Sequence, residues 1–336
     1  MGVSVVEIPY ALSAYAALNE VDVIHDHTVA GPLCVRRRRR VPVVTTNHGP
    51  FNEDLNPIYA EMSRQNVAVV AISKHQASTA RDVNIAAVIH HGIDVDDIPV
   101  GAGDGGYACT VGRMTPSKGI REAALVAREA GVPLRIAAKM RETQERQYFA
   151  DCVRPLLGGD IEYVGELNAA EKYQLMGGAF ALLNPIQWPE PFGLVMIEAL
   201  ACGTPVLATA CGSAPEIITD GDTGFVRREF SSLAKMLNRA QDLDRKQCRN
   251  RAVSHFGTGR MIADHLQLYA RLLECGPDAL RQAQSPTRSD RFLDGAVSNG
   301  KVIVRDRVPA PAVLRRSAIP AGSQPATLSA RPESVL

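Results

Sequence analysis

Two glutamates with seven residues between them, Glu190 and Glu198, lie where the sequence predicts the start of a helix. Pro191 suits the first helical position, where its missing N–H group would have no partner in any case. The N–H groups of residues 192–194 would then be unpaired at the positive end of the helix dipole, which favours a phosphate. Ionised carboxylates accept hydrogen bonds from neighbouring sugar hydroxyls. The segment predicts a sugar-nucleotide site, although an ordinary amphipathic helix with Glu198 exposed would have the same spacing.

A second group of residues that suits phosphate lies earlier in the chain, in the segment Val111–Gly119. Arg113 and Lys118 follow a predicted strand at 107–112. The guanidinium fork and the mobile ammonium can neutralise the two phosphates of a leaving nucleotide. In isolation an ordinary surface pair would explain these residues equally well. Together with the glutamate segment they favour the phosphate interpretation.

The elements that must position these residues alternate between strands and helices, which predicts parallel sheets in α/β layers. In the first part of the chain a helix is predicted at 11–19 and strands at 21–25, 41–46, 67–72 and 86–89. In the second part strands are predicted at 107–112, 134–138, 160–164, 179–183 and 205–208, with helices at 117–130, 142–154, 168–176 and 192–201. A long amphipathic helix is predicted at 254–274.

Histidines gather at the predicted strand ends, in His25-Asp26-His27, Asn47-His48-Gly49 and His90-His91-Gly92. Ligands of parallel sheets bind at the carboxyl ends of strands. No cysteine or acidic set completes a recognised ligand spacing, so we expect no metal. The glycines at 101–106 precede the 107–112 strand, whereas a dinucleotide loop must follow one, and we expect no cofactor.

The segment Pro185–Gly212 resembles the Glu-x7-Glu signature of retaining glycosyltransferases of family four, which have the GT-B fold. The resemblance continues through the strand at Ala201–Ala208 to Pro215-Glu216 and Gly224-Phe225. The segment Val111–Gly119 resembles the diphosphate-binding segment of the same family. The resemblance covers roughly residues 5–275, and it implies two Rossmann-like α/β domains that face a cleft.

The resemblance implies a retaining, metal-independent glycosyltransferase of the hexosyltransferase type. It would move a sugar from a UDP- or GDP-sugar donor to the hydroxyl of an unknown acceptor, which is a small molecule, a lipid or a glycan. Glu190 would hold the donor sugar and Glu198 the ribose. His48 would contact the transferred sugar or the acceptor, and a histidine satisfied within a strand-end loop is the alternative. The other donor-binding positions are Lys139 and Val164 beside the base, and Phe192, Gly193 and Leu194 at the helix start.

The resemblance also divides the chain into domains. The expected parts are an acceptor-side domain at 1–95, a linker at 96–106, a donor-binding domain at 107–253, a terminal helix at 254–275 that crosses back to the first domain, and a disordered tail at 276–336. Family members begin with a strand and a Gly-rich loop, and we expect the first domain to lack this unit. A second hypothesis is therefore a truncated nucleotide-sugar-binding module without turnover.

Composition sets further bounds on partners and location. The formal net charge of +1 gives no reason to expect nucleic-acid binding. Seven cysteines without a Cys-x-x-Cys pair are typical of a reduced, cytoplasmic protein. The run Arg36–Arg40 is a solvated surface or, alternatively, a contact with anionic lipid at the inner face of a membrane.

Overall fold

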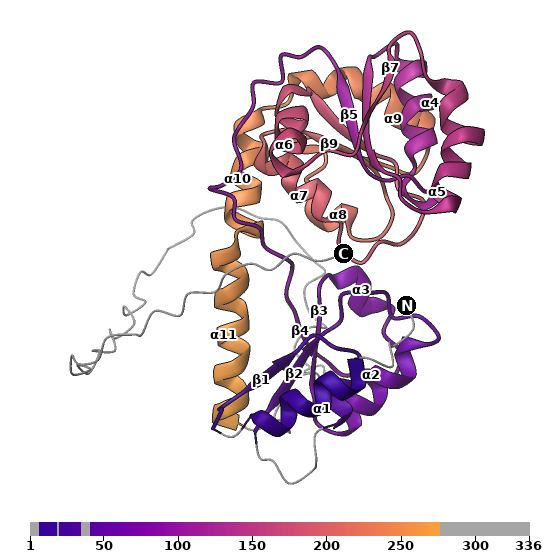
Figure 1. Cartoon of the computed structure of the whole chain (residues 1–336). Helices are drawn as coiled ribbons and strands as arrows, with labels where there is room; N and C mark the ends of the chain where they lie inside the picture. The colour runs from indigo at the N-terminus through magenta and orange to yellow at the C-terminus, as the bar shows by residue number, and fades with distance from the viewer. Residues whose placement is uncertain (1–6, 19, 35–40, 276–336) are drawn as a thin grey trace, which may run out of the picture. The chain divides into compact units, whose positions relative to one another are not determined.

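The computed structural model describes residues 7–18, 20–34 and 41–275. Within these residues the chain forms two parallel sheets surrounded by helices, as Figure 1 shows. This arrangement confirms the predicted α/β class. The run Arg36–Arg40 and the tail at 276–336 lie outside the described residues, so the interpretations placed on them remain predictions.

The first sheet has four strands in the order β1-β2-β3-β4, all parallel. Its strands are β1 (Ile24–Asp26), β2 (Val43–Thr46), β3 (Ala68–Ala71) and β4 (Ile85–Val88). The helices of this part are α1 (Glu7–Ala17), the 3-10 turn η1 (Gly31–Cys34), α2 (Leu55–Arg64) and α3 (Lys74–Ser78). All four predicted strands exist, and each differs from its predicted bounds by a few residues at most.

The second sheet has six strands in the order β10-β9-β8-β5-β6-β7, again all parallel. Its strands are β5 (Ala108–Arg113), β6 (Leu134–Lys139), β7 (Ile161–Gly165), β8 (Ala181–Asn184), β9 (Val206–Thr209) and β10 (Gly224–Arg227). Sequence reasoning predicted the first five of these and missed β10. Its sequence Gly-Phe-Val-Arg lacks the continuous apolar run of β8 and β9, because β10 is fully buried only in its first half.

Helices cover this second sheet on both faces. The helices from residue 116 onward are η2 (Pro116–Lys118), α4 (Ile120–Ala130), α5 (Thr143–Tyr148), η3 (Phe149–Val153), η4 (Arg154–Leu156), α6 (Ala169–Gly178), α7 (Leu194–Ala201), α8 (Ala214–Ile217), α9 (Phe230–Leu237), η5 (Asn238–Asp242), α10 (Arg245–Phe256) and α11 (Thr258–Cys275), of which α11 packs on the first sheet instead. The helix predicted at 142–154 is wrong as one element, because after Tyr148 it continues as one π turn and one 3-10 turn.

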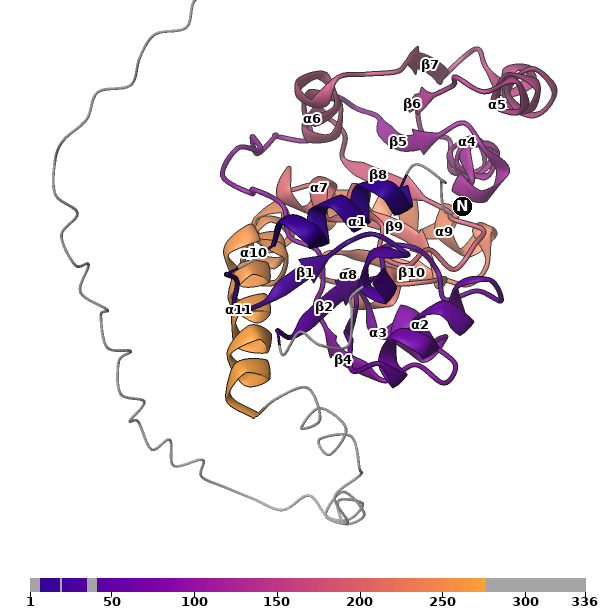
Figure 2. The ribbon, with the colours of Figure 1, turned by 60° about the horizontal axis from the view of Figure 1, so that its bottom comes forward.

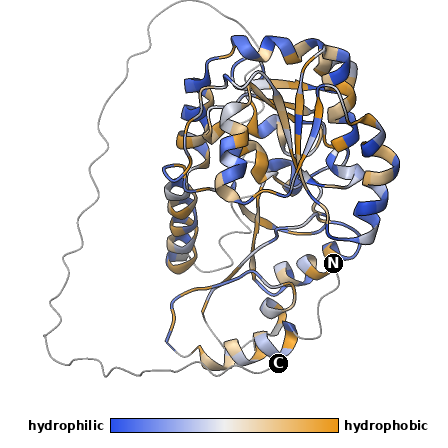
Figure 3. Cartoon of the chain, turned by 45° about the horizontal axis from the view of Figure 1, so that its top comes forward, coloured by the Kyte–Doolittle hydropathy of each residue, from blue (hydrophilic) through white to orange (hydrophobic). Residues whose placement is uncertain are grey.

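Burial explains why the strand segments read as continuous apolar runs. Both faces of each sheet are covered, so every residue of β2, β3, β8 and β9 is buried. Figure 3 shows the same pattern, with hydrophobic strands inside and hydrophilic stretches on the surrounding helices. Two apolar clusters fill the two faces of the second sheet, and smaller clusters pack on the first.

The terminal helical region differs from the single helix predicted at 254–274. Helix α10 continues to Phe256, the chain bends at Gly257, and α11 begins at Thr258. Gly257 forms a parallel bridge with Ile93, whose N–H donates to the Phe256 carbonyl at 2.9 Å while its own carbonyl accepts from the N–H of Thr258 at 3.0 Å. The two segments that connect the sheets are therefore bonded to each other where they cross.

Helix α11 lies alongside the first sheet, as Figures 1 and 2 show. Its Leu268 and Leu272 are buried in one cluster with Val44, Val70 and Ile89 of that sheet. Helix α10, in contrast, packs against α7 of the second sheet. The last two helices thus belong to different sheets.

Candidate functional site

A pocket of about 460 Å³ collects residues that sequence reasoning had picked from distant parts of the chain. Lys118, Glu190 and Gly193 line it from the second sheet, together with Gly112 at the end of β5. His48 lines it from the end of β2 in the first sheet. The carboxyl ends of both parallel sheets therefore contribute to one pocket, as expected for ligand sites of this fold class.

Two glycines explain how Glu190 comes to lie beside Lys118. Gly119 has a φ of 68°, and a Cβ atom there would lie 2.0 Å from the carbonyl oxygen of Pro185. Gly212 has a φ of 60°, and its Cβ would lie 2.4 Å from the carbonyl oxygen of Glu190. Only glycine permits both approaches, because it has no Cβ and tolerates positive φ. The Glu190 backbone is thus held between two turns.

Further hydrogen bonds fix the same loop. The N–H of Gln187 donates to the carbonyl of Ser117 at 2.9 Å, and its side-chain amide donates to the carbonyl of Pro116 at 2.9 Å. The N–H of Ser213 donates to the carbonyl of Glu190 at 3.2 Å. The loop before α7 is therefore anchored on both sides, which orients the Glu190 side chain toward Lys118.

The ammonium of Lys118 donates a hydrogen bond to Oε1 of Glu190, and both side chains are largely buried. Within the described residues, the other carboxylate oxygen of Glu190 and the indole Nε1 of Trp188 are buried without a hydrogen-bond partner. Trp188 also lines the pocket. Buried polar atoms almost always have a partner, so one unpaired acceptor and one unpaired donor in one pocket suit a ligand with hydroxyl groups.

The start of α7 differs from the prediction. The helix begins at Leu194 rather than at 192, because Gly193 takes a left-handed conformation with a φ of 95° and serves as the N-cap residue. Pro191 therefore precedes the helix. The free helical N–H groups belong to Leu194 and Val195, because the N–H of Met196 donates to the carbonyl of Gly193 at 3.1 Å, and Phe192 is not among them.

The side chain of Phe192 is core, with 2% of its surface exposed, and it packs against the rings of His90, His91 and Phe256. Phe192 and Leu194 both line the pocket, but Leu194 is 47% exposed. The helix N-terminus still opens into the pocket, and the phosphate seat expected there stays a prediction.

Four other predicted residues do not line this pocket. Arg113 lies 3.5 Å from the carboxylate of Glu145. Glu198 accepts a hydrogen bond at 2.7 Å from the ammonium of Lys172, which sequence reasoning missed. Lys139 ends β6 with its side chain exposed, and Val164 packs against the core cluster of the second sheet.

Histidines form a second feature beside the pocket. The rings of His27 and His48 share a hydrogen bond of 2.8 Å between Nδ1 and Nε2, and Nδ1 of His48 lies 3.4 Å from Nε2 of His91. His25 bonds the hydroxyls of Tyr269 at 2.6 Å and Thr46 at 2.8 Å. The predicted gathering of histidines at strand ends is therefore present.

Burial and mutual repulsion keep these imidazoles neutral. Burial first, then His27 and His265, lowers the pKa of His25 to about 3. Burial and His48 lower the pKa of His91 to about 4. The pKa values of His27 and His48 are also lowered, again chiefly by burial. In the part of the chain that the structure describes, no group of three or more His, Cys, Asp or Glu is arranged to hold a metal ion.

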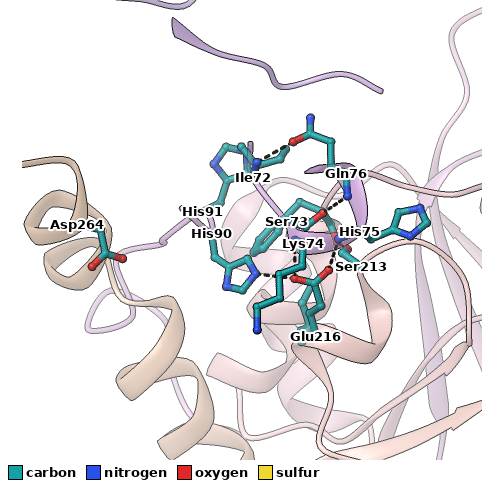
Figure 4. Close-up of polar contacts among 12 residues, drawn as sticks. Ile72, Ser73, Lys74, His75, Gln76, His90, His91, Ser213, Glu216 and Asp264 are labelled. Atoms are coloured by element: carbon teal, nitrogen blue, oxygen red, sulfur yellow. Dashed lines mark hydrogen bonds and ion pairs between the residues drawn. The ribbon is translucent and has the colours of Figure 1, made fainter. Parts of the chain in front are cut away.

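A polar contact that sequence reasoning missed joins the two sheets. Glu216 accepts hydrogen bonds from the backbone N–H groups of Lys74 at 2.8 Å and His75 at 2.7 Å, at the start of α3. Its Oε2 also lies 2.9 Å from Nε2 of His90 (Figure 4). Burial opposes ionisation of Glu216, but these hydrogen bonds outweigh it and lower its pKa. The Pro215-Glu216 pair was noted in the sequence without a role.

Across residues 7–18, 20–34 and 41–275, none of the helices combines the length and the apolar character needed to cross a bilayer.

Comparisons with known proteins bear on family and fold. The model of "Glycosyl transferases group 1" matches residues 99–253, and that of "Glycosyltransferase Family 4" matches residues 5–97. The phosphatidyl-myo-inositol mannosyltransferase of Mycolicibacterium smegmatis is 27% identical over 62% of this chain and 59% of its own length. The alpha-maltose-1-phosphate synthase of Mycobacterium tuberculosis is 28% identical over 47% of each chain. The chain thus spans about half to three fifths of these relatives.

Solved structures agree on the fold. A glycosyltransferase of avilamycin A biosynthesis superposes with a TM-score of 0.62 at 23% identity, over 80% of this chain and 79% of its own. Sucrose-phosphate synthase from Thermosynechococcus elongatus gives a TM-score of 0.67 at 22% identity, over 80% and 78%. These similarities confirm the predicted GT-B fold. With the two family models, they place the chain among GT-B glycosyltransferases that resemble family four.

Proposed function

We propose that this protein transfers a hexosyl group from a nucleotide-diphosphate sugar to an acceptor hydroxyl, with retention of anomeric configuration and without a metal ion. The observation that carries the proposal is the convergence of Lys118, Glu190, Gly193 and the α7 N-terminus in one pocket that His48 completes from the other sheet. A cation, a helix N-terminus and a carboxylate are what a phosphate joined to a sugar needs.

The donor diphosphate would lie between Lys118 and the start of α7. Lysine has three N–H donors, so Lys118 can bond a phosphate oxygen while it still bonds Glu190. Gly193 leaves room for the phosphate, and the N–H groups of Leu194 and Val195 at the helix start would bond it. Arg113 would supply the second cation, oriented by Glu145, whose carboxylate is itself fixed by the N–H groups of Arg141 and Glu142.

The sugar would satisfy the unpaired atoms of this pocket. Oε2 of Glu190 can accept from a hydroxyl, and the indole N–H of Trp188 can donate to one. The ribose would reach Glu198, which lies further along α7 and is held by Lys172. The base would lie beside Lys139 and Val164 at the ends of β6 and β7.

In the proposed step, the acceptor oxygen forms a bond to the anomeric carbon while the bond from that carbon to the phosphate oxygen breaks. The bonding electron pair leaves with the phosphate, and the acceptor proton moves to a phosphate oxygen on the same face of the sugar. Lys118 and the α7 N-terminus stabilise the charge that develops on the leaving phosphate. His48, neutral at pH 7, would lie near the acceptor.

Relatives support a nucleotide-linked hexose. The Anabaena protein HepE, whose fold this chain shares with a TM-score of 0.61 at 20% identity, was solved in complex with UDP and glucose. Free thiols at Cys109, Cys152, Cys202, Cys211 and Cys248 suit the reducing cytoplasm, where we place the protein.

Calorimetric titration with UDP-glucose, GDP-mannose and other sugar nucleotides tests the donor site. We expect Lys118→Met to weaken the bound donor by about 10- to 150-fold, because a charge-assisted contact is worth about 1.5–3 kcal/mol. Lys235→Met is the matched control, since Lys235 is an exposed lysine of α9 outside the pocket. If no sugar nucleotide binds to the folded chain, the proposal fails.

Slow donor hydrolysis separates the enzyme from a binding module without turnover. NMR of the anomeric proton should show the released sugar with the donor's configuration before mutarotation, at the same rate with and without EDTA. Binding without any hydrolysis or transfer would favour the module. Inverted product would overturn retention, and loss of rate in EDTA would overturn metal independence.

A further inference from the structure

A second pocket, of about 320 Å³, lies next to the first and has no part in holding the donor as proposed. His48, His91 and Ile72 line both pockets, so the two are contiguous. The rest of its wall comes from the first sheet and from α11, including His25, His265 and Tyr269. A molecule in this second pocket would therefore lie beside a sugar in the first.

The lining of this second pocket contains no Asp, Glu, Lys or Arg. Its polar groups are imidazoles and the hydroxyls of Thr46 and Tyr269. The pKa values of His25, His27, His48 and His91 are all lowered, so these four rings are neutral near pH 7. An anionic ligand would lose its hydration here without gaining an ion pair. An uncharged ligand would pay no such cost.

One imidazole has an unpaired acceptor. Nδ1 of His265 lies 2.8 Å from the carbonyl oxygen of Met261, so this nitrogen carries the proton and donates it. In the tautomer that this bond favours, Nε2 is an acceptor with a bare lone pair. Among the described residues it has no hydrogen-bond partner, although it is buried. A hydroxyl of a bound molecule is the group that would satisfy it.

The remaining wall is apolar and partly open. Ile89 is buried, whereas Ile262 and Leu266 on α11 line the pocket with 50% and 58% of their surfaces exposed. Large aliphatic side chains that stay exposed at the edge of a pocket favour a ligand with an apolar part.

We propose that this histidine-lined pocket binds the acceptor, and that the acceptor is an uncharged molecule with hydroxyl groups and an apolar face, one hydroxyl donating to Nε2 of His265. The inference rests on the proposed transferase function, since it names the substrate class of the same reaction. It also assigns α11, the last described helix, to substrate recognition.

Pairs of glycosides that differ only in charge test whether the acceptor must be uncharged and carry an apolar group. The probes are phenyl and octyl β-D-glucopyranosides, each compared with the corresponding β-D-glucuronide, which differs by a carboxylate in place of a hydroxymethyl group. Binding is measured by saturation-transfer NMR and by titration of the full chain at pH 7.5, with and without UDP. We expect at least one glucoside to bind, and its glucuronide to bind at least about tenfold more weakly.

Variants of α11 locate the binding. Leu266→Glu puts a charge on the pocket wall at an exposed position, and Leu273→Glu puts the same charge on the same helix outside the pocket, where Leu273 is 52% exposed. We expect the first to weaken glucoside binding about tenfold or more and the second to leave it unchanged. His265→Phe, which keeps a ring but removes the lone pair, should weaken it about 2- to 12-fold.

Three results would overturn the inference: no glucoside binding, equal binding of glucoside and glucuronide, or equal effects of the two glutamate variants. UDP binding measured on the same samples keeps this test separate from the donor proposal. If UDP binds and the glucosides do not, the acceptor inference fails alone. If UDP and the sugar nucleotides do not bind to the folded chain, the transferase proposal itself fails.

Discussion

Glu216 and His90 lie 2.9 Å apart between Oε2 and Nε2, although 126 residues separate them in the chain. Because Glu216 also accepts the N–H groups at the start of α3, one carboxylate links the second sheet to the first. The start of a helix is a favourable site for negative charge, and here the Glu216 carboxylate accepts two N–H groups that have no partner within the helix.

Replacing Glu216 by Ala should destabilise the protein by about 1–3 kcal/mol, because backbone donors in a partly buried position lose their acceptor. The urea midpoint measures the change. Glu162→Ala is the control, since Glu162 forms an exposed pair with Arg135 and should change stability by less than about 1 kcal/mol. Equal midpoints for the two variants would contradict the prediction.

Gly212→Ala should destabilise the fold and also weaken donor binding. Positive φ at a residue with a Cβ costs about 1–2 kcal/mol, and the clash with the Glu190 carbonyl adds to this. Gly259→Ala in α11 provides the comparison, because a Cβ there has open space and alanine favours the helix by up to about 1 kcal/mol. Thermal unfolding and UDP-glucose titration measure the stability and the donor affinity of both variants. A Gly212→Ala variant with wild-type stability and affinity would contradict the prediction.

Replacing Trp188 by Phe should weaken donor binding without a comparable loss of protein stability. Its Nε1 has no partner among the described residues, so losing it should leave the free energy of unfolding nearly unchanged. If a donor hydroxyl bonds Nε1, the variant should bind the sugar nucleotide about 2- to 12-fold more weakly, because one neutral hydrogen bond is worth about 0.5–1.5 kcal/mol. Titration with UDP alone is the control and should be unaffected. Unchanged affinity for the whole donor would remove Trp188 from the sugar site.

Stability should fall as the pH drops below about 6.5, the ordinary pKa of histidine. The unfolded chain binds protons on His25 and His91 below that value, whereas the folded chain binds them only near about 3 and about 4. The unfolded state therefore holds more protons between these limits, so stability rises with pH there and is complete above about 6.5. Glu216, with a lowered pKa, loses its contribution only below the ordinary carboxylate range.

Melting temperatures of the wild type and of His91→Asn at pH 5.0 and 7.5 measure this effect. The variant should lose less on acidification, because it lacks one of the neutral imidazoles. His255→Asn, outside both pockets, provides a comparison: burial and Arg251 also lower the pKa of His255, so this variant should change the pH dependence in the same direction. An identical pH dependence in wild type and His91→Asn would count against the assigned cause.

Local signals explain which parts of the fold the sequence could predict. The strands of both sheets are short apolar runs bounded by helical stretches. The histidines follow strands of the first sheet directly in the sequence, so their position at the strand ends could be predicted. Pro191 misled the prediction because it is a strong helix-start signal, whereas the left-handed conformation of Gly193 depends on packing. The break at Gly257 was missed because the helical pattern continues on both sides of it.

Contacts between distant residues were beyond sequence reasoning. Glu145 lies beside Arg113, and Lys172 bonds Glu198, yet nothing in the spacing of these residues marks them as partners. Lys118 and Glu190 were picked separately as phosphate and sugar ligands, whereas the ion pair between them requires the two glycine turns. The lone pair of His265 depends on its bond to Met261 within α11.

The bridge between Ile93 and Gly257 has a mechanical consequence. The two segments that connect the sheets are held together there by backbone hydrogen bonds, and Arg260 adds side-chain bonds to the carbonyls of His90 and His91. Any change in the angle between the two sheets would therefore strain this crossing or break the bonds between Glu216 and the start of α3.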